Sequence, residues 1–256
     1  MKRILRIGRS IWRRLYGASS AFGRGLVGNE YASRSYSQYG EDMVLRAVFA
    51  RYPATYPGFY VDIGAHHPLR FSNTRFFYER GWSGICVDPL PCAAKLFARL
   101  RPRDIFLQAG VAAREGEMTY YMFDEPAFNT FTEQIAKENA ERVKNQQRIK
   151  VLPLCRIIGE HLPSGRMIDF LSIDVEGLDL EVLRSNDWAH YRPCIVLIEE
   201  TAASTLEGVE NLAVTSFMKQ QDYKAILRTP SGLFFVDGRL TTYEGGCYLN
   251  FFVELH

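Results

Sequence analysis

The chain can be arranged around residues 58–68, Gly-Phe-Tyr-Val-Asp-Ile-Gly-Ala-His-His-Pro. This stretch begins as an apolar run and ends in a turn of small residues, histidines and a proline, and residues 69–80 after it have the pattern of a helix. An apolar run of this length between turn residues predicts a buried strand of a parallel sheet. Ligands of open α/β sheets bind at the carboxyl ends of the strands. We therefore expect Asp62 and Gly64 where a first strand meets a binding loop.

The same alternation of strand and helix continues along the chain. Further main strands are predicted at residues 83–89, 105–111, 167–174, 194–198, 224–228, 233–236 and 248–255. Helices are predicted at residues 36–52, 72–81, 91–100, 178–184 and 206–220. Between them, residues 118–123 and 149–154 are strand-like, and residues 124–147 have the composition of an exposed helical insertion. The pattern predicts one doubly wound α/β domain over residues 30–256, with an insertion near residues 118–150.

Composition excludes some classes of function. The 256 residues are 47% hydrophobic, which is enough for a sizeable core, and 31 basic residues nearly balance 29 acidic ones. Net charge therefore gives no support to nucleic-acid binding. No run reaches the roughly 18 apolar residues of a membrane-spanning helix. The five cysteines are odd in number and widely scattered, which favours reduced, mostly structural thiols in a cytoplasmic protein.

Residues 1–29 differ from the rest of the chain. They are rich in arginine, and no acidic residue precedes Glu30. Ile4, Leu5, Ile11, Trp12 and Leu15 recur near helical spacing beside a basic face. This pattern is typical of a helix on an anionic membrane surface, but it is equally compatible with a basic arm or with a helix packed on the body. The first interpretation predicts peripheral contact with the inner face of a membrane.

Acidic side chains follow most of the predicted strands. They are Asp62, Asp88, Asp174 with Glu176, and Glu199 with Glu200. Carboxyl ends of parallel strands share one edge of a sheet, so these acids are expected to converge. In nucleotide-binding folds, a ribose-binding acid follows the glycine turn by roughly 20 residues. Asp88 follows Gly64 at a similar spacing. Asp88 is therefore predicted to accept hydrogen bonds from ribose hydroxyls.

The loop after the first strand lacks the glycines that phosphate binding needs. It contains neither Gly-x-Gly-x-x-Gly nor Gly-Lys-Ser/Thr. A P-loop is therefore excluded. A nicotinamide-dependent oxidoreductase becomes the weaker alternative, because a pyrophosphate can approach the backbone closely only where such glycines are present. A cofactor with ribose and adenine but no phosphate fits better, and S-adenosylmethionine is such a cofactor.

Several segments, in order and at fitting intervals, resemble the FkbM family of S-adenosylmethionine-dependent methyltransferases over roughly residues 36–255. They are Ser37 to Asp42, Val61 to Pro68, Ser72 to Thr74, Gly81 to Gly84, Val87 to Pro89 and Ser172 to Gly177. The resemblance implies a Rossmann-like class I methyltransferase sheet of seven mostly parallel strands, the last antiparallel. It also implies O-methylation of a hydroxyl, often on a sugar or polyketide.

The resemblance also implies roles for residues around the cofactor. Asp62, Gly64 and Ala65 would line its methionine end, Asp88 and Pro89 would border the ribose, and Gly110 and Val111 the adenine. Gln108 stands where family members commonly have Asn, so an adenine contact there is less expected. His66 belongs to the loop that touches the cofactor, and Gln38, Ser72 and Asn73 are candidates for the rim of the pocket. Ser72 could equally cap its helix.

Chemistry narrows the catalytic candidates. Methyl transfer is an in-line displacement that depends mostly on alignment, and a sugar hydroxyl also needs a base or a metal. Asp174 is the first candidate, followed by His67 and Glu176. Asp174, Glu199 and Glu200 could instead bind Mg²⁺ or Mn²⁺, as acids after the same strands do in metal-dependent O-methyltransferases, which this arrangement resembles.

The sequence thus predicts a cytoplasmic O-methyltransferase that acts on a hydroxyl of a sugar, glycan or glycolipid precursor. Two alternatives stay open, an oxidoreductase with a nicotinamide cofactor and a scaffold that keeps the fold without turnover. The basic residues 1–29 favour a lipid-linked or anionic acceptor, and no nucleic-acid partner is expected.

Overall fold

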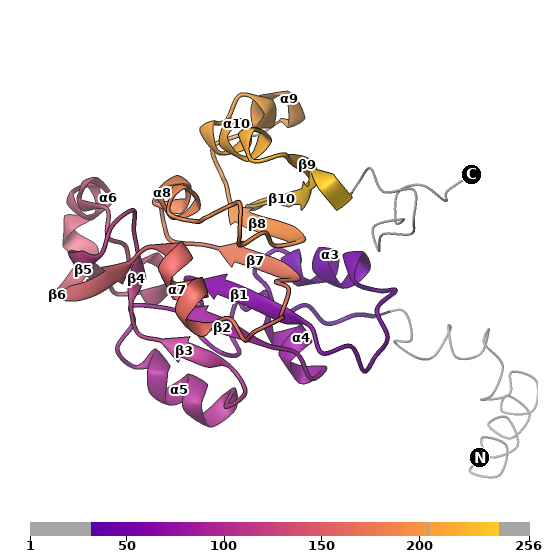
Figure 1. Cartoon of the computed structure of the whole chain (residues 1–256). Coiled ribbons are helices and arrows are strands. Elements are labelled where there is room, and N and C mark those ends of the chain that lie inside the picture. Colours follow the sequence, from indigo (N-terminus) through magenta and orange to yellow (C-terminus); the bar gives the residue numbers. More distant parts are fainter. Residues whose placement is uncertain (1–31, 204, 241–256) are drawn as a thin grey trace, which may run out of the picture. The chain divides into compact units, whose positions relative to one another are not determined.

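The computed structural model describes residues 32–203 and 205–240. It divides the chain into two units, residues 1–35 and 36–256, and all that follows concerns the second. Its centre is a seven-stranded sheet of order β3-β2-β1-β7-β8-β10-β9 (Figure 1). Among these strands β10 pairs antiparallel with both of its neighbours, and the remaining pairs are parallel. The predicted Rossmann-like methyltransferase sheet is confirmed, including its antiparallel last strand.

The strands of this sheet are short and mostly buried. Their bounds are β1 Phe59–Ile63, β2 Ser83–Val87, β3 Ile105–Leu107, β7 Phe170–Ile173, β8 Ile195–Glu199, β9 Tyr223–Arg228 and β10 Gly232–Asp237. All five residues of β1 are buried, as the opening apolar run predicted. Because β1 lies between β2 and β7, strand order reverses at its side, and the switch point predicted for ligand binding falls at its carboxyl end.

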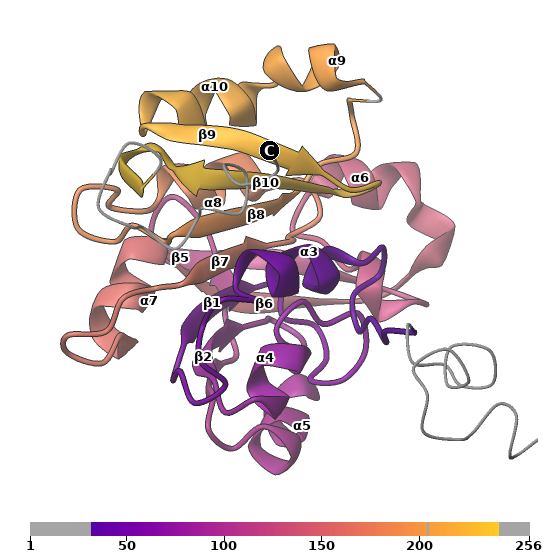
Figure 2. The same cartoon turned by 90° about the vertical axis from the view of Figure 1, so that its right-hand side faces the viewer.

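Side chains alternate between the two faces of the sheet, and each face has its own core. Phe59, Val61 and Ile63 of β1 pack on one face, whereas Tyr60 packs on the other. The first face is covered by α7 Leu154–His161, α8 Asp179–Arg184, α9 Leu206–Glu210 and α10 Ala213–Gln220. The second face is covered by α3 Glu41–Val48, α4 Arg75–Glu79 and α5 Ala93–Leu100. The result is three layers, and Figure 2 shows α10 lying along β9 at one end of them.

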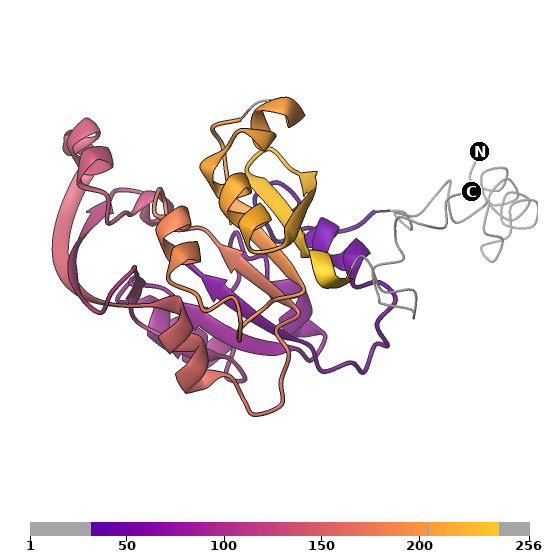
Figure 3. The ribbon, with the colours of Figure 1, turned by 45° about the horizontal axis from the view of Figure 1, so that its top comes forward.

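The predicted insertion forms a second sheet rather than a helical segment. Its three strands have the order β4-β6-β5, with bounds β4 Gly110–Val111, β5 Gly116–Phe123 and β6 Val143–Leu152. The helical pieces between β5 and β6 are only η1 Pro126–Phe128, α6 Glu133–Glu138 and η2 Ala140–Arg142. Figure 3 shows the long β5–β6 ribbon, in magenta to salmon, beside the main sheet. Charged residues in β6 resembled a helical face, but here they form the exposed side of a two-stranded ribbon.

Three other elements differ from the predictions. The strand predicted at residues 105–111 is split, because β3 pairs with β2 whereas β4 pairs with β6 of the second sheet. The helix predicted at residues 206–220 is broken into α9 and α10 at Asn211, and helix α7 was not predicted. These differences arise from pairing and packing between distant segments, which local patterns do not contain.

Some predictions fall outside the described residues. These are the basic arm at residues 1–29, the strand at residues 248–255 and Cys247. The four described cysteines form no disulfide, as expected for reduced thiols. Within residues 32–203 and 205–240, no helix combines the length and the apolar character needed to cross a bilayer.

Candidate active site

A cavity of about 720 Å³ opens at the carboxyl ends of the central strands. Its wall includes the ends of β1, β2, β7 and β8, the loops after them, and residues 120–135 of the insertion. This size lies within the range of about 300–1,000 Å³ that small-molecule sites occupy. The cavity is at the predicted switch point, so it is the candidate active site.

Gly64 lets the first loop turn tightly beside β7. Its φ is +82°, and a Cβ placed there would lie 1.7 Å from the carbonyl oxygen of Asp174. The Gly64 amide donates to the Val87 carbonyl, and the Asp174 amide donates to the Ile63 carbonyl, both at 2.9 Å. Only glycine fits this close approach. Gly64 therefore brings the ends of β1, β2 and β7 together at the floor of the cavity.

Asp88 lies on the cavity wall directly after β2. Its side chain is buried, and its carboxylate accepts hydrogen bonds from the His66 amide at 2.7 Å and the Leu90 amide at 2.8 Å. Burial raises the pKa of Asp88 to about 6, although the two backbone hydrogen bonds oppose the rise. Each carboxylate oxygen can accept more than one hydrogen bond. Asp88 is thus held in place and can still accept hydrogen bonds from a ligand.

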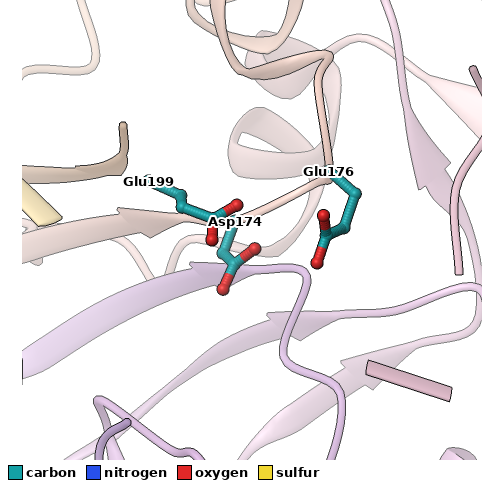
Figure 4. A group of neighbouring side chains, drawn as sticks. All are labelled: Asp174, Glu176 and Glu199. Atoms are coloured by element: carbon teal, nitrogen blue, oxygen red, sulfur yellow. The ribbon is translucent and has the colours of Figure 1, made fainter. Parts of the chain in front are cut away.

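Three carboxylates meet at the ends of β7 and β8. One oxygen of each of Asp174, Glu176 and Glu199 lies within 4.8 Å of the others (Figure 4). Asp174 follows β7, Glu199 ends β8, and Glu176 reaches the group from the next loop with a φ of +52°. A positive φ in a glutamate is uncommon and costs backbone energy. The fold thus holds this carboxylate cluster together despite mutual repulsion.

Crowding changes the acidity of the cluster. The Asp174 carboxylate is exposed to the cavity, yet desolvation by the surrounding protein, and then repulsion from neighbouring carboxylates, raises its pKa well above its usual range. The same two causes raise the pKa of Glu176 to about 7, and burial also raises the pKa of Glu199. Asp174 and Glu199 share a hydrogen bond, which requires a proton on one of them. The cluster can therefore hold a proton near neutral pH, and it favours a positive charge in its place.

Two acids of the cavity wall, Glu200 and Asp179, differ from what the sequence led us to expect. Glu200 lines the cavity, but its carboxylate accepts from the Ala202 amide at 2.7 Å and does not join the cluster. The group that could bind a metal contains Glu176 in place of Glu200. Asp179, not predicted, lines the cavity, and burial followed by repulsion from Glu199 raises its pKa to about 7. As an acid in the first turn of α8, it resembled an ordinary helix cap.

The two histidines have different surroundings. His66 lines the cavity with a φ of +45°. His67 does not line it, since its Nδ1 accepts from the amides of Leu69 and Arg70 at 3.0 and 3.1 Å and closes a turn. Burial, followed by the charge of Arg70, lowers the pKa of both. Of the two, His66 is therefore the one on the cavity wall, and His67 orders the loop.

Asp62 and Ser72 belong to a buried network behind the cavity instead of lining it. Asp62 lies in β1 between residues that face the other way, so its carboxylate points to the second face and accepts from Thr74 at 2.8 Å. Ser72 accepts from Arg101 at 3.2 Å. Burial raises the pKa of Asp62 to about 6, with Arg101 opposing the rise. The network holds the loop against the sheet.

The remaining predicted cofactor residues divide in the same way. Gln38, Pro89, Gly110 and Val111 line the cavity. Ala65, Asn73 and Gln108 do not: Ala65 packs in the second core, Asn73 donates to Ser172 at 3.0 Å, and Gln108 is exposed outside the wall. These three were assigned from motif position, which does not determine where a side chain points.

The second sheet supplies a wall that the sequence did not reveal. Tyr120 of β5 lines the cavity, and its ring lies 4.8 Å from that of Phe131. Burial, followed by the charge of Asp88, raises the pKa of Tyr120. Phe131 and Ile135 complete this side. Their spacing showed no pattern that would have separated them from ordinary core residues.

Comparison with known proteins gives a family for the chain. The family model described as the methyltransferase FkbM domain matches residues 62–225. The chain belongs to the FkbM methyltransferase family. Its FkbM domain extends from the middle of β1 into β9 and includes the carboxylate cluster and the whole insertion. The match thus places the chain in a family described as methyltransferases.

A crystal structure of methyltransferase FkbM from Methylobacillus flagellatus KT has a similar fold. The two chains are 15% identical and have a TM-score of 0.49. The match covers 78% of this FkbM chain and 48% of the other, so the present chain spans about half the length of that neighbour. No curated protein matches the chain.

Proposed function

We propose that this FkbM protein uses S-adenosylmethionine to methylate a hydroxyl of a sugar, glycan or glycolipid precursor. The observation that carries the proposal is a single cavity with a buried acid at the end of β2 and a carboxylate cluster at the ends of β7 and β8. The first fits a ribose and the second fits a cation beside a reacting hydroxyl. The family supplies the reaction class, and this pairing supports the methyl donor.

The walls of the cavity fit a nucleoside. Asp88 can accept hydrogen bonds from the ribose hydroxyls, and the adjoining Pro89, Ala109 and Val111 offer apolar surface to the base. A Cβ at Gly110 would lie 2.6 Å from the ring of Phe131, so only glycine fits between the two. The wall contains no glycine-rich phosphate loop, which favours a cofactor without phosphate.

The carboxylates fit the charge of the donor. A sulfonium is a cation, and the cluster around Asp174 favours positive charge, whereas the uncharged thioether product loses that attraction. Asp174 is also placed to take the proton of the acceptor hydroxyl, because its raised pKa makes it a stronger base than an ordinary carboxylate. We assign to Asp174 the role of base, with Glu176 and Glu199 setting its acidity.

The same carboxylates also fit a divalent cation. Asp174, Glu176 and Glu199 offer three oxygens within 4.8 Å of one another, the hard donors that Mg²⁺ and Mn²⁺ prefer. Such an ion, when bound, would lower the pKa of the acceptor hydroxyl. The two roles of the cluster give opposite outcomes with EDTA. Loss of methylation that Mg²⁺ or Mn²⁺ restores supports a metal, and unchanged methylation supports Asp174 as a base without metal.

Membrane contact belongs to the same proposal. The basic, amphipathic pattern of residues 1–29 supports peripheral contact with the inner face of a membrane, where lipid-linked precursors are accessible to a cytoplasmic enzyme.

Calorimetry tests the cofactor. S-adenosylhomocysteine should bind and NAD should not, because the wall lacks the glycines that a pyrophosphate needs. Asp88→Ala should weaken S-adenosylhomocysteine binding about tenfold or more, since a buried hydrogen-bonded acid is lost. Binding of NAD alone would overturn the proposal. Mass spectrometry of surface glycans and lipids with and without the gene should then show the loss of one methyl group.

A further inference from the structure

The opening of the cavity carries exposed aromatic rings. Among the described residues, the large hydrophobic side chains that are clearly exposed include three aromatic ones, Tyr39 at 51%, Phe71 at 44% and Phe128 at 48%. All three line the cavity, although they come from the segment before α3, the loop after β1 and the insertion. Single exposed hydrophobic residues are ordinary, but aromatic rings gathered at one cavity point to a binding surface. We call these three residues the aromatic rim.

The aromatic rim is held in place by charged contacts. The Arg70 guanidinium lies 4.4 Å from the centre of the Phe71 ring and donates two hydrogen bonds of 3.0 Å to Glu125. Glu125 also accepts from the Ala127 amide and so caps η1, which carries Phe128. The bidentate pair thus ties the loop after β1 to the insertion. A positive φ of +51° at Phe71 shows that the surroundings hold this residue in a costly conformation.

The charge behind the aromatic rim selects against anions. Seven acidic residues line the cavity, Asp88, Glu125, Asp174, Glu176, Asp179, Glu199 and Glu200. Arg70 is the one lysine or arginine on the described wall, and Glu125 already pairs with it. A phosphate or carboxylate on the acceptor would meet like charge there. An acceptor with several hydroxyls would instead supply donors to these carboxylates, whereas a plain aryl ring would leave them without donors.

We propose that the aromatic rim is the acceptor subsite and takes an uncharged sugar ring. The C–H face of the ring would lie on Tyr39, Phe71 or Phe128, and its hydroxyls would point towards the carboxylate cluster. Aromatic faces suit this task because they offer a large apolar surface at little entropic cost. The inference rests on the proposed function, and it narrows the acceptor to neutral sugars, against the anionic acceptor that the basic residues 1–29 favoured.

Saturation-transfer difference NMR on the full chain tests the subsite. The probes are neutral methyl glycosides of glucose, mannose and fucose, methyl glucuronide as an anionic counterpart, and benzene as an aryl counterpart without hydroxyls, with catechol added as an aryl ring that has only two. At least one neutral glycoside should receive saturation at its ring C–H protons, and the glucuronide, benzene and catechol should receive less. Absence of transfer to every neutral glycoside, or stronger transfer to the glucuronide, benzene or catechol, would overturn the proposal.

Matched variants show where the probe binds. Tyr39→Ala and Phe128→Ala should each weaken glycoside binding about fivefold, the effect of losing one aromatic contact. Phe128→Trp should keep it. The controls Met167→Ala and Leu206→Ala remove side chains that are 64% and 76% exposed outside the cavity, and they should change nothing. All these residues are exposed, so the variants should fold, which circular dichroism checks. Equal glycoside binding by the rim variants and the control variants would refute the assignment of the aromatic rim as the acceptor subsite.

The design separates this inference from the proposed function. Glycoside binding is measured with and without S-adenosylhomocysteine, and S-adenosylhomocysteine binding is measured alone by calorimetry. If S-adenosylhomocysteine binds and no neutral glycoside does, only the acceptor subsite fails. If S-adenosylhomocysteine does not bind, the proposed cofactor fails, and the NMR experiment without it still decides the subsite.

Discussion

Asp174 lies where the structure concentrates negative charge. Desolvation by the surrounding protein raises its pKa most, and repulsion from Glu199, Glu176 and Asp179 adds to that effect. A carboxylate in such surroundings binds a proton or a cation more readily than an ordinary surface acid. Its chemistry thus depends on neighbours that come from the loop after β7, from α8 and from the end of β8.

Asp174→Asn should remove the base or metal ligand and keep the shape of the side chain. We expect kcat to fall by about 10²–10⁴, the usual contribution of a general base. S-adenosylhomocysteine affinity should stay within a few-fold of wild type, because Asp88 is intact. Methyl transfer to an acceptor in cell extract gives the first quantity and calorimetry gives the second. The control is Glu207→Gln, an exposed acid of α9 outside the cavity. An unchanged rate in Asp174→Asn would show that the cluster does no chemistry.

Gly64→Ala should destabilise the protein more than Gly81→Ala. Both glycines have a positive φ, +82° and +93°, so alanine is strained at either position by about 1 kcal/mol. At Gly81 a Cβ would meet no atom within 4 Å, whereas at Gly64 it would overlap the Asp174 carbonyl. Urea unfolding should therefore show a clearly larger loss for Gly64→Ala. Equal losses would mean that β1 and β7 do not approach as closely as described.

At the scale of elements, the insertion has the clearest functional consequence. The β5–β6 ribbon and η1 place Tyr120, Phe128 and Phe131 on the cavity wall, opposite the loops of the main sheet. The main sheet thus supplies the charged side chains and the insertion supplies most of the aromatic ones. Variation in the insertion would alter the shape of the proposed acceptor subsite.

A second feature at this scale is a group of salt bridges around Asp237 at the end of β10, which we call the ion-pair clamp. Asp237 is buried and pairs with both Arg192 and Arg239 at 2.7 Å. Burial raises the pKa of Asp237, but hydrogen bonds from the two arginines outweigh it and bring the pKa to about 2. The clamp ties the antiparallel strand to the segment before β8.

Asp237→Asn should lower the free energy of unfolding by about 2 kcal/mol near neutral pH, the cost of losing a hydrogen bond between charged groups. Because the folded pKa lies below the usual 3.8, the carboxylate stabilises the fold above about pH 4, and this contribution disappears as pH falls through about 2. In urea unfolding, the difference in free energy of unfolding between wild type and variant, which we call the gap, should become smaller over that pH range. Glu210→Gln, at an exposed site of α9, should show no gap, and a gap for Asp237→Asn that is independent of pH would contradict the account.

For the whole molecule, the proposed membrane contact can be tested directly. Replacing Arg3, Arg6, Arg9, Arg13 and Arg14 with glutamine removes most of the positive charge of residues 1–29. The full chain should float with vesicles that contain anionic lipid, and the variant should not. Binding of the full chain should also weaken at about 1 M salt, where charge interactions are screened beyond about 3 Å. Equal flotation of both proteins would refute the contact.

Much of the scaffold could be predicted from local patterns. Apolar runs between turn residues located β1, β2, β7 and β8, because a buried strand needs such a run whatever surrounds it. The single strand predicted at residues 105–111 was wrong, because the apolar run is continuous in sequence but its two halves pair with different sheets. Residues 143–147 were wrongly predicted to be helical for a similar reason, since exposed positions carry polar residues in a helix and in a strand alike.

The sequence by itself determined the parallel sheet, the edge at which a cofactor would bind, and Asp88 and Asp174 as acids of that edge. Strand ends follow from local composition, so these could be inferred without coordinates. Only the tertiary structure decided that Glu200 stays outside the carboxylate cluster while Asp179 lies near it, that Asp62 turns away, and that the aromatic rim lines the cavity. The reason is physical: side-chain direction depends on strand register and on loops that meet only when distant segments pack.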